Sequence, residues 1–231
     1  MAVVVGGEMP GAALLAAEAA LRLAGYVALV DGGSGGPHAL VRRTWREVAQ
    51  DTRVGALLIG SGLGRSAAGY AKLDDARAML VPHVLDGDAL MILGARGTPS
   101  FKARPHPVIL TPHAGEFDAL FGESLVDKVS RTHTAAVASG ATIIFKGPQT
   151  VIASPDGAVV VSDDAPSWLA SAGTGDVLAG MVTGLLASGL TPFDAACAAV
   201  WLHGECARLA GPALIADDLP PLIGAAVAKC L

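Results

Sequence analysis

An isolated acid follows a glycine turn in the second half of the chain. The segment SAGTGDVLAG, residues 171–180, places Asp176 after Gly173 and Gly175 and directly before a long apolar run. Aspartate is favoured near a helix N-terminus by capping and by the helix dipole, so a structural role is open. The alternative is chemical, because exposed amides of a glycine turn bind anions and a nearby carboxylate can take a proton from a substrate hydroxyl.

Two more polar residues follow a predicted strand in LTPHAGEF, residues 110–117. His113 and Glu116 are three apart, so they share one face of the first turn of a predicted helix. An imidazole and a carboxylate at this place can meet a substrate or a hydrated magnesium ion. Capping of the helix start explains the same residues, and that interpretation stays open. For Asp86 and Asp88, in DGDAL, turn formation is the simplest explanation.

Two glycine-containing loops are candidates for binding a ligand through the backbone. IGSGLGR, residues 59–65, has the spacing G-x-G-x-G and places Arg65 where a dinucleotide fingerprint needs glycine. A loop that a ligand approaches closely and a plain tight turn both explain this spacing. A phosphate-binding P-loop motif does not occur in the sequence. In FKGPQT, Lys146 ends a predicted strand, and its charge together with the amides of the following turn can hold a phosphate. A solvated surface lysine is the simpler alternative.

These segments are separated by elements that alternate between strand and helix. The short apolar runs at 2–5, 26–30, 56–60, 89–93, 107–110 and 141–146 predict buried strands. Helical spacing predicts helices at 11–24, 66–81, 116–121, 127–139, 176–187, 192–210 and 219–230. A hairpin is expected around residues 155–157. The alternation predicts an α/β fold with a mostly parallel sheet, helices on both faces and ligands at the carboxyl ends of the strands.

Composition limits the classes of function. The 231 residues are 52% hydrophobic and 16% charged, with a net charge of −5, and no linker divides them, so we expect a single domain, 1–231. Scattered basic residues argue against a nucleic-acid partner and favour a small-molecule ligand. We expect no membrane contact, because the longest uncharged span is interrupted and short. Three cysteines without a paired spacing and the absence of a signal-like start indicate the cytoplasm.

The order of the motifs narrows the interpretation. MPGAALLAAEAALRLAG, GSGLG, DGDAL, TPHAGE, KGPQT, SAGTGDVLAG and TPFDAACAAVWLHG follow one another along nearly the whole chain. This order resembles the ribokinase-like superfamily and, within it, the ADP- or ATP-dependent NAD(P)H-hydrate dehydratases. The segment containing Asp176 is specific to the superfamily, and TPH together with KGxxT is typical of the dehydratase branch. The resemblance implies a ribokinase-like three-layer sandwich. The departures within the motifs are mild, including Ala172 where a second glycine is usual, whereas the glycine-rich stretch 31–37 suggests a shortened connection, a more serious departure.

The resemblance also implies an activity. Family members restore hydrated NADH or NADPH to NAD(P)H by phosphorylating the ring hydroxyl and eliminating phosphate, with ADP or ATP as phosphoryl donor and Mg²⁺ present. It makes Asp176 the catalytic base beside an anion hole. The other residues to which it gives roles are Gly173, Thr174 and Gly175 (anion hole), Lys146, Gly147, Pro148, Gln149, Thr150 and Gly175 (nucleotide), Ala12, Gly62, His113 and Asp176 (hydrate), and Glu116 (indirect contact with magnesium).

Further expectations and alternatives accompany this assignment. The resemblance implies a homo-oligomer, a tetramer in many family members, and an epimerase on another chain. A small-molecule kinase of the same superfamily, phosphorylating a sugar or a vitamin precursor such as hydroxyethylthiazole, is the second interpretation. A catalytically silent nucleotide-binding homologue is the third. The sequence does not distinguish ADP from ATP, or hydrated NADH from hydrated NADPH.

Overall fold

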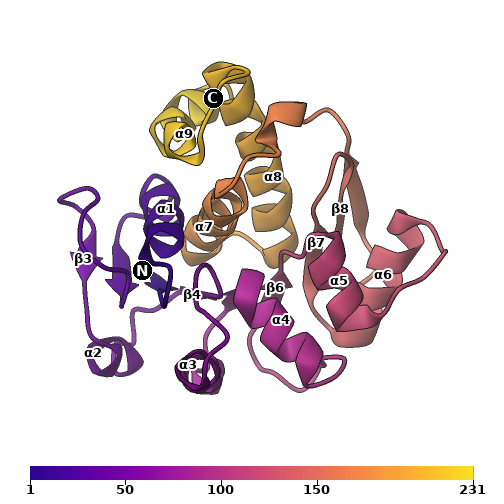
Figure 1. Ribbon diagram of the computed structural model, residues 1–231, viewed down its shortest axis with the longest axis horizontal. Helices are drawn as coiled ribbons and strands as arrows, with labels where there is room; N and C mark the ends of the chain where they lie inside the picture. The colour runs from indigo at the N-terminus through magenta and orange to yellow at the C-terminus, as the bar shows by residue number, and fades with distance from the viewer. Residues whose placement is uncertain (231) are drawn as a thin grey trace.

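The computed structural model describes residues 1–230, and a single nine-stranded sheet organises them (Figure 1). The strand order is β3-β2-β1-β4-β5-β6-β7-β8-β9. Neighbouring strands from β3 to β7 are parallel, and β8 and β9 add an antiparallel hairpin at one edge. The strands are β1 Ala2–Val5, β2 Val27–Val30, β3 Val41–Arg42, β4 Ala56–Ile59, β5 His83–Leu85, β6 Val108–Leu110, β7 Thr142–Phe145, β8 Thr150–Ala153 and β9 Val159–Ser162.

Helices cover both faces of the sheet, which confirms the predicted three-layer α/β sandwich. One face carries α1 Pro10–Leu21, α7 Thr174–Ala187, α8 Pro192–Ala210 and α9 Leu219–Ala228, seen in the upper half of Figure 1. The other carries α2 Trp45–Ala49, α3 Ala67–Ala78, α4 Gly87–Ala95, α5 Ala114–Phe121 and α6 Lys128–Ser139. Two short 3₁₀ turns, Ser167–Leu169 and Ala216–Asp218, flank α7 and α9. None of the helices in residues 1–230 has the length and apolar character needed to cross a membrane.

The core follows from the alternation of side chains along each strand. Val4 and Leu58 face the α1/α7 side, whereas Val3 and Leu57 face the α3/α4 side, and all four are fully buried. Alanine and glycine allow α1 and α7 to pack closely. A β-carbon on Gly180 would lie 2.8 Å from Cα of Ala16, so this contact requires glycine. The close packing fixes where α7 begins.

Register brings the carboxyl ends of the central strands to one edge. Val5 pairs with Ile59, Ile59 with Leu85, and Leu85 with Leu110. The residues that follow these strands therefore lie side by side at the same edge. This is the edge at which the sequence predicts ligands to bind.

The predicted strand at 89–93 is wrong. Residues 87–95 form α4, and the strand is the preceding His83–Leu85. ALMIL contains leucine, methionine and alanine, which favour helices, and a short apolar run does not distinguish a buried strand from a buried helix. Asp86 consequently lies at a carboxyl end, not at the entrance to a strand. The short elements β3 and α2 were not predicted, because they are only 2 and 5 residues long.

Candidate active site

Asp86 lies at the centre of the carboxyl edge of the sheet. It follows β5, and its side chain is almost completely buried. Thr111 donates a hydrogen bond to Oδ1 of Asp86 at 2.6 Å, and Ser61 lies 3.3 Å from Oδ2. Thr111 follows β6 and Ser61 comes two residues after β4, so three adjacent strand ends converge on one carboxylate. The sequence prediction gave this acid no role beyond a turn.

Lys146 pairs with two of the buried acids. Its Nζ lies 3.0 Å from Oδ1 of Asp86 and 3.9 Å from Oε2 of Glu116. Burial alone lowers the pKa of Lys146, but the two carboxylates outweigh it and hold that pKa above its ordinary value. Lys146 is therefore not the solvated surface lysine of the simpler interpretation. Its charge is already committed to protein carboxylates.

Glu116 and His113 form a reciprocal cap at the start of α5. The Glu116 amide donates to Nδ1 of His113 at 3.3 Å, and the His113 amide donates to Oε2 of Glu116 at 2.8 Å. Nε2 of His113 lies 3.3 Å from Oε1 of Glu116. Burial raises the pKa of Glu116, while Lys146 opposes the rise. Helix capping therefore accounts for the contacts between His113 and Glu116. The Glu116 carboxylate also faces Lys146, which capping does not explain. The side chain of His113 is 61% exposed, so its outer face is open to a ligand.

Asp176 occupies the first turn of α7 without capping it. The N-cap is Gly173, and no side-chain capping hydrogen bond closes this helix start within residues 1–230. Burial raises the pKa of Asp176 to about 6. The Asp86 carboxylate adds to this rise, and the Ser61 hydroxyl and Lys146 ammonium oppose it. Asp176 therefore belongs to the same cluster as Asp86 and Lys146.

The turn before Asp176 has a left-handed residue at Gly173, with φ of 86°. A β-carbon there would lie 2.9 Å from Cβ of Ala216, so both the backbone and the packing require glycine. The hydroxyl of Thr174 donates to the carbonyls of Leu169 and Ser171, at 2.8 and 2.9 Å, which fixes the turn. The Thr174 amide donates to the Ser171 carbonyl at 3.4 Å, a long hydrogen bond.

Gly175 brings the turn against Lys146. A β-carbon on Gly175 would lie 3.3 Å from Nζ of Lys146, so the backbone at the start of α7 approaches the ammonium closely. The first amides of a helix have no acceptor within the helix and point outward from its N-terminus. The positive end of α7 thus lies beside Asp176, next to a lysine whose charge is already paired with Asp86 and Glu116. This arrangement favours an anion at the start of α7.

The GSGLG loop packs beneath the start of α1. Gly62 has φ of 65°, and a β-carbon there would clash with the carbonyl oxygen of Met9 and lie 3.0 Å from the Cβ atoms of Met9 and Ala12. The amide of Met9 donates to the Gly62 carbonyl at 2.9 Å. Asp88 accepts a hydrogen bond from the Gly64 amide at 2.8 Å, so this acid shapes the loop. The structure therefore brings Ala12 and Gly62 together, with Gly62 buried and Ala12 partly exposed.

Residues 146–149 form the turn between β7 and β8, and Thr150 is the first residue of β8. Gly147, Pro148 and Gln149 are exposed, and the Thr150 hydroxyl donates to the Gly147 carbonyl at 3.2 Å. Lys128, at the first position of α6, donates to the carbonyl of Lys146 at 3.0 Å and also to that of Gln149. Sequence reasoning missed Lys128, because its contact with this turn spans 18 residues or more.

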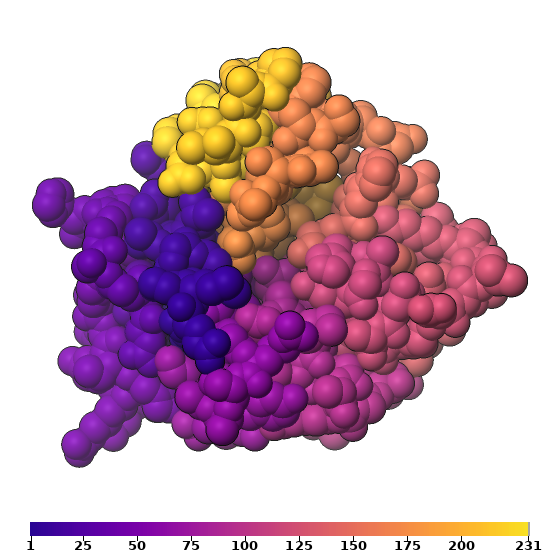
Figure 2. Space-filling view, in the orientation of Figure 1, coloured from indigo at the N-terminus to yellow at the C-terminus, as the bar shows by residue number. Residues whose placement is uncertain are grey.

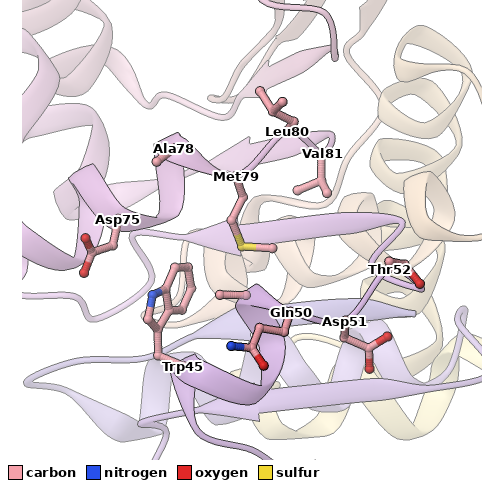
Figure 3. Close-up of a pocket in the computed structure, with 10 residues that line it drawn as sticks. Trp45, Gln50, Asp51, Thr52, Asp75, Ala78, Met79, Leu80 and Val81 are labelled. Carbon is pink, nitrogen blue, oxygen red and sulfur yellow. The ribbon is translucent and has the colours of Figure 1, made fainter.

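The surface is hollowed at the centre of the face shown in Figure 2, between the orange segment and the magenta to pink segments. A separate groove of about 420 Å³ is lined by Trp45, Asp75, Met79 and Leu80, among others (Figure 3). Its residues precede β4 and β5, so it lies at the amino ends of the strands. Asp86 and Asp176 are not part of it.

Comparison with known proteins shows the family of the chain. A family model described as NAD(P)H-hydrate dehydratase matches residues 2–227. The ADP-dependent (S)-NAD(P)H-hydrate dehydratase of Neisseria meningitidis serogroup B is 38% identical, covering 94% of this chain and 81% of that protein. The bifunctional NAD(P)H-hydrate repair enzyme Nnr of Mycobacterium tuberculosis is 42% identical, over 81% of this chain. This chain spans 40% of the length of that relative.

Solved structures show the same fold. The ADP/ATP-dependent NAD(P)H-hydrate dehydratase from Bacillus subtilis, co-crystallised with ATP/Mg²⁺, superposes with a TM-score of 0.84 and 31% identity, covering 98% of this chain and 88% of that one. The architecture is the ribokinase-like fold implied by the motif order. Both the match over residues 2–227 and the identity with the Neisseria protein exceed what a shared fold alone produces. The chain therefore belongs to the NAD(P)H-hydrate dehydratase family.

Proposed function

We propose that the chain catalyses the ADP- or ATP-dependent dehydration of hydrated NADH or NADPH. The observation that carries this proposal concerns Asp176. Its carboxylate is partly buried in the first turn of α7, does not cap that helix and has a pKa of about 6. A residue that only capped the helix would accept backbone hydrogen bonds and keep a low pKa. The names of the Neisseria and Bacillus relatives support the choice of substrate and donor.

The reaction has two parts. The hydroxyl oxygen on the hydrated ring attacks the terminal phosphorus of the nucleotide, the bond to the nucleotide breaks, and the hydroxyl proton passes to Asp176. Phosphate then leaves with the electrons of its C–O bond while the ring loses a proton, which restores the dihydropyridine. Phosphate is a far better leaving group than hydroxide, so nucleotide consumption makes the elimination feasible. A pKa of about 6 leaves Asp176 ionised at neutral pH and able to accept the proton.

The negative charge on the oxygens of the transferred phosphoryl group must be stabilised by hydrogen-bond donors, and the start of α7 can supply them. Gly173, Thr174 and Gly175 are the residues we assign to this anion hole, with the helix end adding its positive potential. The Thr174 amide already makes a long hydrogen bond within the turn, so Gly173 and Gly175 are the stronger donors. Glycine at position 175 leaves room beside Lys146 for an oxygen of the ligand.

Nucleotide and hydrate occupy opposite sides of Asp176 in this proposal. The nucleotide lies on the β7–β8 turn, where Gly147, Pro148, Gln149 and Thr150 supply backbone and hydroxyl groups beside Lys146. The hydrate lies against Ala12, Gly62 and His113. The exposed outer face of His113 and the partly exposed Ala12 support this assignment.

The buried carboxylates Asp86 and Glu116 are suited to contact a magnesium ion only indirectly, through its bound water molecules. Both oxygens of Glu116 lie within 3.3 Å of nitrogens of His113, and no cluster of three or more candidate ligands occurs in residues 1–230. Magnesium retains several waters and is held by few carboxylates together with substrate phosphates. Glu116 and Asp86 would therefore contact a hydrated ion indirectly, and the ion would neutralise phosphate charge. The predicted tetramer and the separate epimerase stay predictions.

A direct assay tests the proposal. Purified protein is incubated with hydrated NADH and ADP or ATP, and the absorbance of the reduced nicotinamide is followed. Recovery of that absorbance with release of phosphate is expected, and Asp176→Asn should abolish it while retaining ADP binding. A stable phosphorylated product without recovery would instead identify a small-molecule kinase. Stabilisation by nucleotide without any turnover would identify a silent homologue.

A further inference from the structure

The side chain of Lys128 is hydrogen-bonded to the backbone of the β7–β8 turn. Its Nζ donates to the carbonyls of Lys146, at 3.0 Å, and of Gln149. The same nitrogen lies 4.3 Å from the centre of the Phe145 ring, so its stem and head are both held in place. An ammonium has three N–H groups, and the two carbonyls use two of them. One donor is left for a ligand.

The charge of Lys128 is not neutralised by any carboxylate. None of the ion pairs within residues 1–230 includes Lys128, and burial lowers the pKa of Lys128 to about 8. The adjacent Asp127 instead accepts a hydrogen bond from the Ser130 amide at 2.9 Å, where it caps α6. Lys146 differs, because Asp86 and Glu116 already compensate it. Of the two lysines at this turn, Lys128 has the charge to offer.

Gly147 keeps the approach to this ammonium clear. A β-carbon at position 147 would lie 2.9 Å from Nζ of Lys128, and the φ of Gly147 is 151°. Any side chain there would crowd the nitrogen. A compact, uncompensated ammonium beside exposed backbone suits a phosphate oxygen, since lysine binds phosphate as a point charge.

We propose that Lys128 is a nucleotide-binding residue whose ammonium contacts a phosphate oxygen of ADP or ATP, while Lys146 holds the buried carboxylates. The inference rests on the proposed function, which puts the nucleotide on the β7–β8 turn. It revises the prediction that Lys146 supplies the charge for phosphate. With this contact, the chain should bind nucleotides more tightly than nucleosides.

The test compares Lys128→Met and Lys128→Arg with the wild-type chain. Binding of adenosine, AMP, ADP and ATP is measured by calorimetry, with thermal melting to check folding. We expect Lys128→Met to weaken ADP binding by about 10- to 100-fold, the effect of losing one charge-assisted hydrogen bond, and to leave adenosine binding unchanged. Lys128→Arg should retain most of the ADP affinity. Lys102→Met, at an exposed lysine before β6, changes the net charge equally and should bind ADP like the wild type.

Two results would overturn the inference without touching the proposed function. Unchanged ADP affinity in Lys128→Met would show that the ammonium does not contact the phosphates. An equal loss for adenosine and ADP would show that Lys128 only maintains the shape of the turn. Failure of the wild-type chain to bind any adenine nucleotide would instead remove the proposed function itself, and this inference with it.

Discussion

The ammonium of Lys146 lies 3.0 Å from Oδ1 of Asp86, although the two residues are 60 positions apart in the chain. Only 19% of the lysine side chain and 4% of the aspartate side chain are exposed. Glu116 and Asp176 complete a cluster of three acids around this one cation. An excess of buried negative charge is unfavourable for the folded chain, and it disposes the site to accept a proton.

Lys146→Met should therefore destabilise the protein. Removing one partner of a buried ion pair leaves an uncompensated charge and typically costs about 3–5 kcal/mol. Urea denaturation measures the free energy of unfolding. Adding Asp86→Asn to Lys146→Met should recover part of that loss, because the acid nearest to Lys146 is neutralised while Glu116 and Asp176 keep their charges. A loss below about 1 kcal/mol in the single variant would show that water already compensates the pair.

Asp176→Asn is expected to stabilise the protein at pH 8. With a pKa of about 6 in the folded chain, against an ordinary value of 3.8, Asp176 adds stability below pH 3.8 that is lost as pH rises through 6. A neutral amide avoids that loss, so we expect a gain of about 1–3 kcal/mol in the free energy of unfolding.

A matched control comes from the first turn of α8. Oδ2 of Asp194 lies 2.6 Å from the hydroxyl of Thr191, the N-cap, so this acid does take part in capping. Asp194→Asn should lower the melting temperature slightly or leave it unchanged. Destabilisation by Asp176→Asn of the same size as by Asp194→Asn would assign Asp176 to helix capping.

The pH dependence of turnover gives a separate measure of Asp176. A general base must be deprotonated, so kcat/KM should fall about tenfold per pH unit below a pKa near 6 and level off above it. Initial rates measured between pH 4.5 and 8 are sufficient to define this acidic limb of the pH–rate profile, and melting curves exclude unfolding as its cause. A limb centred near the ordinary aspartate pKa would contradict the cluster geometry.

Much of this site could be predicted because its motifs are local. The glycine turn, Asp176 and the apolar run of α7 are contiguous, and His113 and Glu116 lie on one helical turn. Such patterns identify which residues meet a strand end or a helix start. The mostly parallel sheet was predictable for the same reason, since strand and helix patterns alternate along the chain.

The role of Asp86 was not predictable, because its partners are distant in sequence. Thr111 and Lys146 reach it across 25 and 60 residues, and only the strand register brings them together. The incorrect strand at 89–93 also placed Asp86 at the wrong end of its element. The role proposed for Lys128 was not predictable for the same reason. A lysine without a carboxylate partner can be recognised only when the residues around it in the folded chain are known.

Gly62→Ala tests whether the GSGLG loop shapes the hydrate pocket. The added carbon would clash with the carbonyl oxygen of Met9 and lie 3.0 Å from the Cβ atoms of Met9 and Ala12, and φ of 65° is unfavourable for alanine. The left-handed backbone alone should cost about 1–2 kcal/mol in the free energy of unfolding, and the clash with the Met9 carbonyl should add to this loss. Because the start of α1 must shift, KM for the hydrate should rise while KM for ADP stays nearly constant.

Gly224→Ala on α9 is the control, since nothing lies within 4 Å of the added carbon there and helix propensity improves. If the KM values for hydrate and ADP rose together, the loop would have a general structural role and Gly62 would not belong to the hydrate pocket.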